Sequence, residues 1–181
     1  MLSREQILRA LDRLAAILRE HGTEGEVCLL GGTVMVLAFN ARAATKDVDA
    51  IFEPADVIRE AAVVVQKEQG LPDGWLNDGA KGFLSSHHAV DAGDLPQFDG
   101  LRVTAPTAEY MLAMKCMASR IAHADTDPSD VVDIRFLLAH LGITSPDAAL
   151  AIVGRFYPAD RVPARAVYLL EAVLGQENDA P

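Results

Sequence analysis

Two adjacent glycines, Gly31 and Gly32, separate two short apolar stretches of this chain, residues 26–30 and residues 33–40. The order predicts a strand that ends in a tight turn and leads at once into a short helix. Glycine has no Cβ, so its backbone approaches neighbouring groups closely. Amides at the first turn of a helix attract anions. The segment therefore predicts an anion-binding turn at the rim of a sheet.

Two carboxylates, Asp47 and Asp49, follow a basic loop that carries Arg42 and Lys46. The residues around them are otherwise apolar, so segment 48–52 predicts a second strand. Side chains two positions apart on a strand share a face. Close carboxylates repel each other unless a cation lies between them, and their oxygens suit Mg²⁺. The pair therefore indicates a Mg²⁺ or Mn²⁺ site near the glycine turn, unless it is only a pair of surface residues at a strand end.

The remaining segments predict a small α/β core followed by helices. Strands before helices favour an α/β (α+β) fold, with a small mixed sheet flanked by helices in residues 1–105. A helical C-terminal region, 106–181, packs on that core or forms one single domain with it. The sequence predicts a first helix between Ser3 and Gly22, a helix over 54–69, a loop with one helical turn over 71–82, strands over 87–91 and 101–104, and helices over 109–121, 129–141, 145–156 and 160–174.

Charge and hydropathy exclude several classes of protein. The formal net charge of −10 argues against a broad surface for duplex DNA. Apolar runs are too short for a membrane span, and charged residues interrupt the N-terminal segment where a signal peptide would need an apolar run. We therefore expect a cytoplasmic protein without a membrane partner, whose two cysteines, Cys28 and Cys116, are buried free thiols.

The glycine turn, Arg42, Thr45 and the Asp47-Val48-Asp49 stretch together resemble the signature of the nucleotidyltransferase (polymerase β-like) superfamily. Within it, the chain is most similar to the AbiEii-type toxin group. Relatives of that type carry a lysine on a later helix, here Lys115. A further helix then carries the motif Asp-x-x-Asp-Ile, which here is Asp130 to Ile134 and includes Asp133. The resemblance covers about residues 26–138.

The resemblance implies transfer of a nucleoside monophosphate from an NTP to an RNA or protein acceptor, with Mg²⁺ or Mn²⁺. Many relatives place serine at the second position of the glycine turn, where this chain has Gly32 followed by the hydroxyl of Thr33. A third metal-binding carboxylate would be Asp91. The implied catalytic residues are Asp47, Asp49, Lys115 and Asp133, the first two also binding metal, and the implied nucleotide-binding residues are Gly31, Gly32, Thr33, Arg42 and Lys46.

Other interpretations remain open at this level. Lys115 lies among apolar residues, so it either meets a nucleotide phosphate or forms a structural ion pair with Asp133 or Asp130. The AbiEii resemblance implies the toxin of a toxin–antitoxin system, with a cognate antitoxin as partner. The alternatives are a catalytically silent nucleotide-binding or protein-interaction module on the same fold, and an antitoxin-type nucleotidyltransferase that modifies a partner toxin.

Overall fold

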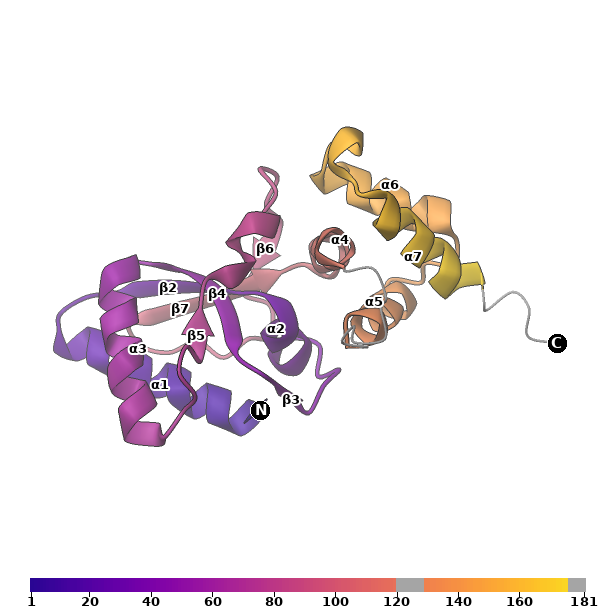
Figure 1. Ribbon diagram of the computed structural model, residues 1–181. Coiled ribbons are helices and arrows are strands. Elements are labelled where there is room, and N and C mark those ends of the chain that lie inside the picture. Colours follow the sequence, from indigo (N-terminus) through magenta and orange to yellow (C-terminus); the bar gives the residue numbers. More distant parts are fainter. Residues whose placement is uncertain (120–128, 176–181) are drawn as a thin grey trace. The chain divides into compact units, whose positions relative to one another are not determined.

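The computed structural model describes residues 1–119 and 129–175, and these residues form an α+β protein of two compact units (Figure 1). One unit combines Met1–Gly82 with Val90–Pro106, and the other combines Phe83–Ala89 with the helices from Thr107 onward. The predicted boundary after residue 105 is one residue away from the observed one. The prediction missed segment 83–89, which belongs to the helical unit because the Ser85 amide donates a hydrogen bond to the Tyr110 hydroxyl.

A mixed five-stranded sheet, in the order β5-β4-β2-β7-β6, forms the centre of the first unit among the described residues. β2 is antiparallel to β4 and parallel to β7, β5 is parallel to β4, and β6 is antiparallel to β7. The end of β2, the start of β4 and all of β5 therefore meet at one rim. The strands are β2 (Gly25–Leu29), β4 (Val48–Glu53), β5 (Leu76–Asn77), β6 (Val90–Asp91) and β7 (Leu101–Pro106).

One face of this sheet is the core of the unit. Val27 of β2 pairs with Phe52 of β4 and with Val103 of β7, and all three side chains are buried. Helices α1 (Arg4–Glu20) and α3 (Ala55–Gln69) cover this face (Figure 1). Leu18 of α1 and Ile58 of α3 approach the sheet at Gly25, where a Cβ would collide with Leu18. Both helices and both central strands lie close to their predicted positions.

The short elements differ from the predictions. Helix α2 (Gly31–Leu37) begins two residues earlier than expected, because the Leu30 amide still donates to the Asp49 carbonyl and the chain turns directly into the helix. The predicted basic loop contains β3 (Ala44–Thr45), which pairs with β1 (Leu2–Ser3) in a small second sheet. The predicted loop 71–82 contains the unexpected strand β5, and its predicted helical turn is the start of a 3₁₀ helix, η1 (Gly79–Phe83).

The second unit consists, in its described part, of segment 83–89 and four α-helices. The first of them ends at Ala118 instead of residue 121, and the last begins at Ala164 instead of residue 160. The predictions for residues 120–128, which include the end of the helix predicted over 109–121, fall outside the described residues. Thr107 caps α4, so the helix begins at Ala108, two residues after Pro106. The Tyr110 ring of α4 stacks on Phe156 of α6, with centroids 4.8 Å apart. The helices are α4 (Ala108–Ala118), α5 (Ser129–His140), α6 (Pro146–Phe156) and α7 (Ala164–Gly175), with the 3₁₀ turn η2 (Ala159–Arg161) before α7.

Both cysteines are free thiols, as predicted, although only Cys116 is fully buried and Cys28 is half-buried on β2. Burial raises the pKa of Cys116 to about 12 and raises the pKa of Cys28 as well. At pH 8 both therefore stay protonated, and the thiol is the unreactive form. We expect Ellman's reagent to modify Cys28 slowly and Cys116 only after unfolding. Rapid modification of Cys116 under native conditions would contradict the packing of α4.

Candidate functional site

The Asp49 carboxylate lies between two glycine-containing turns at the rim where β2, β4 and β5 meet. A Cβ on Gly31 would lie 2.7 Å from Asp49 Oδ2, and a Cβ on Gly79 would lie 3.9 Å from Asp49 Oδ1. Gly31 also has a positive φ of 58°, which side chains other than glycine rarely adopt. The chain therefore brings the backbone of the first turn against one carboxylate oxygen, and only glycine permits this approach.

The second glycine of the turn meets the basic loop. A Cβ on Gly32 would lie 2.5 Å from the Thr45 hydroxyl oxygen and 3.4 Å from Arg42 Nη1. Thr45 is held in place by the small sheet, where it pairs with Leu2 at the start of the chain. The first residues of the protein thus fix the loop that carries Arg42 beside the glycine turn.

Asp47 lies one residue before β4 and is half-buried. The Thr33 hydroxyl donates a hydrogen bond to the Asp47 carbonyl at 3.1 Å, and Thr33 is fully buried. This hydroxyl, expected to meet a phosphate, ties α2 to the chain segment that carries Asp47. Lys46, in the same segment, is exposed. The structure thus gathers six of the site residues predicted in this unit around one rim, with Asp47 placed there by its backbone carbonyl: Gly31, Gly32, Thr33, Arg42, Asp47 and Asp49.

Asp91, the candidate third carboxylate, is not brought to this group. It lies on β6, which is separated from β4 by β7 and β2. Asp91 pairs with Ala105 and therefore shares the helix-covered side of the sheet, whereas Asp49 alternates with Ala50 and faces the other side. In the described part of the chain, no group of three or more His, Cys, Asp and Glu side chains gathers at one place.

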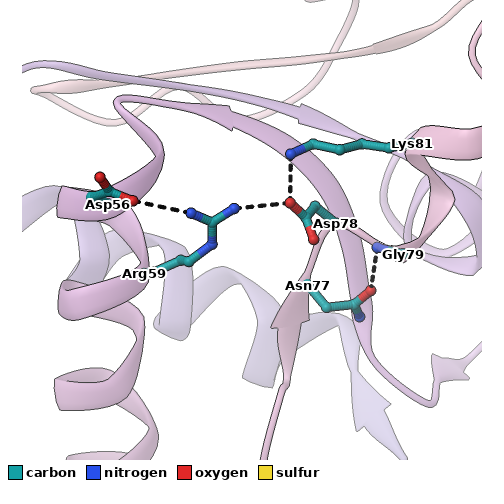
Figure 2. A network of polar contacts seen from close by, with 6 residues as sticks. All are labelled: Asp56, Arg59, Asn77, Asp78, Gly79 and Lys81. Carbon is teal, nitrogen blue, oxygen red and sulfur yellow. Dashed lines mark hydrogen bonds and ion pairs between the residues drawn. The ribbon is translucent and has the colours of Figure 1, made fainter.

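Asn77 is the neighbour of Asp49 that the sequence analysis missed. It pairs in register with Asp49 across the parallel strands β4 and β5, so both side chains lie on the same face. The Asn77 side-chain oxygen accepts a hydrogen bond from the Gly79 amide at 2.9 Å (Figure 2). The Asn-Asp-Gly sequence of residues 77–79 is typical of a turn in which the asparagine side chain accepts from a backbone amide two residues later. The sequence around this turn gives no indication that Asp49 is its neighbour.

An ion-pair network holds the chain that follows Asn77. Asp78 accepts hydrogen bonds from Arg59 of α3 and from Lys81 of η1, and Arg59 also reaches Asp56 (Figure 2). Lys81 and then Arg59 lower the pKa of the Asp78 carboxyl. Asp78 therefore stays ionised at neutral pH and links α3 to the turn beside Asp49.

Lys115 and Asp133, the two remaining predicted site residues, lie in the helical unit. Lys115 Nζ lies 2.7 Å from Asp130 Oδ1 and 2.9 Å from Asp133 Oδ2. Asp133 is 1% exposed and Lys115 is 8% exposed. The ion pairs that the sequence allowed for Lys115 are thus both present. The catalytic roles of Lys115 and Asp133 stay predictions.

Comparisons with known proteins add no assignment. No model of a protein family, no curated protein and no solved structure matches this chain. Within the described residues, no helix is long and apolar enough to cross a membrane.

Replacing Gly31 by alanine should impair ligand binding at the site in addition to lowering the stability of the fold. The new Cβ would displace the Asp49 carboxylate, and the positive φ adds a backbone cost of about 1–2 kcal/mol. We expect lower stability in urea unfolding and loss of the rise in melting temperature that Mg²⁺ with NTP should cause in the wild-type protein. Gly70→Ala is the matched control, because Gly70 has a φ of 63° but no atom within 4 Å of its Cβ position. It should lose stability alone, and an equal loss of binding in both variants would contradict the close approach.

Proposed function

We propose that this protein is a nucleotidyltransferase that moves a nucleoside monophosphate from an NTP to a hydroxyl group of RNA or protein. The observation that supports it best is the contact of the Gly31 turn with the Asp49 carboxylate. A glycine turn, two nearby carboxylates and a basic loop are what binding of a triphosphate with its cation requires. The sequence resemblance points to the same chemistry.

The donor set fits a divalent cation bound together with phosphate. Mg²⁺ is commonly held by one or two carboxylates plus phosphate oxygens of the substrate. Asp47 and Asp49 would hold Mg²⁺ or Mn²⁺, and the lack of a Cβ on Gly31 lets the backbone pass close to the Asp49 carboxylate. A cation bound there supplies charge neutralisation and activates the acceptor oxygen.

The protein groups around the carboxylates would bind and orient the nucleotide. The Gly31 backbone lies against the Asp49 carboxylate, and the Gly32 backbone lies against the Thr45 hydroxyl and close to the Arg42 guanidinium. Arg42 and Lys46 place positive charge in the adjacent loop of an otherwise acidic protein. Such a local cation pair favours a compact polyanion over a long duplex, so we expect measurable NTP binding and weak duplex DNA binding.

A label-transfer experiment tests the proposal. The protein is incubated with each NTP labelled at the α-phosphate, with Mg²⁺, and with cellular RNA or protein. Label is expected in one of the two acceptors with at least one NTP. A labelled partner toxin would assign the antitoxin-type role, and labelled RNA would favour the toxin role. Absence of label with every NTP and acceptor would overturn the proposal.

A catalytically silent nucleotide-binding module is the second candidate. The described residues favour it in one respect, because the rim contributes only two carboxylates, Asp47 and Asp49, and Asp91 lies elsewhere. Such a module would show a rise in melting temperature with Mg²⁺ and NTP but no label transfer. The two measurements together therefore distinguish the candidates.

A further inference from the structure

We infer that Asn77 is the third protein ligand of the cation proposed above, a neutral amide at the position next to Asp49. This inference rests on the proposed function and specifies its site. Asn77 pairs directly with Asp49 across β4 and β5, and residues paired in register project to the same face. Among the described residues, Asn77 is the one that the pairing of β4 with β5 places directly opposite Asp49.

The oxygens of the two side chains border one small space. A Cβ built on Gly79 would lie 3.0 Å from Asn77 Oδ1 and 3.9 Å from Asp49 Oδ1. The Gly79 amide donates to Asn77 Oδ1, so the oxygen and not the NH₂ group faces this space. A carbonyl oxygen has two lone pairs, so Oδ1 accepts this hydrogen bond and still has one lone pair for a cation.

The network of Figure 2 keeps Asn77 in this position. Asp78 is anchored to Arg59 of α3 and to Lys81 of η1, on either side of the turn. The residue directly before Asp78 is therefore fixed on two sides, by the strand pairing and by the ion pairs. A ligand on a fixed segment does not have to be ordered when the cation binds.

An amide in this place changes the charge of the site and hence its preferred ligand. Two carboxylates and an amide carry a charge of −2, whereas three carboxylates would carry −3. Cation affinity rises with the number of charged ligands, so this site holds a bare cation weakly. The triphosphate supplies the missing negative charge, and the cation is taken up as its nucleotide complex.

The test replaces Asn77 by aspartate and measures binding of Mn²⁺ alone, from the loss of the electron paramagnetic resonance signal of free Mn²⁺. Aspartate keeps the oxygen that accepts from Gly79, so the turn is retained. We expect the Kd for Mn²⁺ to fall by about tenfold or more relative to wild type, because a charged ligand replaces a neutral one. A decrease of less than about fivefold would overturn the inference.

Two double variants show whether the expected gain in Mn²⁺ affinity comes from this site. Asn77→Asp combined with Asp49→Asn should lose the gain, because the two side chains share the cation. Asn77→Asp combined with Asp91→Asn should retain it, because Asp91 lies on β6, away from the site. A gain that survives Asp49→Asn would overturn the inference.

The melting temperature gives a second readout that separates misfolding from a change at the site. Without metal, Asn77→Asp should melt below wild type, because a new carboxylate lies beside Asp49. With Mn²⁺, Asn77→Asp should melt above wild type. A melting temperature that stays below that of wild type in the presence of Mn²⁺ would count against the inference. Label transfer is scored separately, so a gain in Mn²⁺ affinity without transfer would leave the ligand assignment standing and remove the proposed function.

Discussion

Nucleotide transfer is expected to fall by at least about 10³-fold when Asp47 and Asp49 are replaced together by asparagine. Both carboxylates are proposed to hold the cation, and removal of both leaves no charged ligand at the rim. Each single variant should lose most of the activity as well, because the two side chains act as one unit. The measurement is label transfer at saturating NTP and Mg²⁺, with the acceptor identified for the wild-type protein.

Asp91→Asn is the matched control for this experiment. It removes one negative charge, as each single variant does, from an exposed residue of the same sheet, on β6 and on the opposite face. Its activity should stay within about twofold of wild type, because exposed surface substitutions away from a site have small effects. An equal loss in Asp91→Asn, or activity that survives in the double variant, would contradict the placement of the site.

Binding can be separated from catalysis by thermal melting. A ligand that binds only the folded state stabilises it by about 2.7 kcal/mol at a concentration of 100 Kd. Mg²⁺ with NTP should therefore raise the melting temperature of wild type, and the Asp47/Asp49 double variant should not respond. A shift that is the same in both proteins would place the nucleotide elsewhere.

Local patterns of this sequence predicted the longer elements well. The predicted first helix begins with a capping box, in which the Gln6 amide donates to the Ser3 hydroxyl and the Gln6 side-chain oxygen accepts from the Ser3 amide. The apolar runs that became β2 and β4 and the periodic helices of the C-terminal unit carry their own signals. The short strands carry no such signal, because each forms only through a distant partner. Leu2 pairs with Thr45, and Asn77 pairs with Asp49, over separations that no local pattern records.

The same difference explains which site residues could be predicted. Gly31, Gly32, Asp47 and Asp49 lie in one stretch of sequence, and their spacing predicted that they would lie near one rim of the sheet. Asn77 and Asp91 required the strand register, which decides both the neighbouring strand and the face. Asp91 was proposed from its position on a later strand, and the register places it on the wrong side. Asn77 lies beside Asp49 although its segment was expected to be a loop.

Lys115→Met is expected to destabilise the helical unit strongly. The substitution keeps an unbranched side chain in α4 but leaves Asp133, which is 1% exposed, without its cation. Removing one partner of a buried ion pair typically costs about 3–5 kcal/mol. Urea unfolding followed by circular dichroism measures the loss. Arg155→Met is the matched control, because its ion pair with Glu109 is largely exposed and should contribute at most about 1 kcal/mol.

A second substitution separates the structural role of Lys115 from the catalytic role that the resemblance implies. Lys115→Met combined with Asp133→Asn removes both buried charges, and Asp130 remains partly in solvent with 34% of its side chain exposed. Most of the lost stability should return, because an uncompensated buried charge causes the cost. If the two residues also act in catalysis, transfer in this stable double variant stays at least about 10²-fold below wild type. Recovery of transfer together with stability would show that Lys115 and Asp133 hold the helices together and do nothing more.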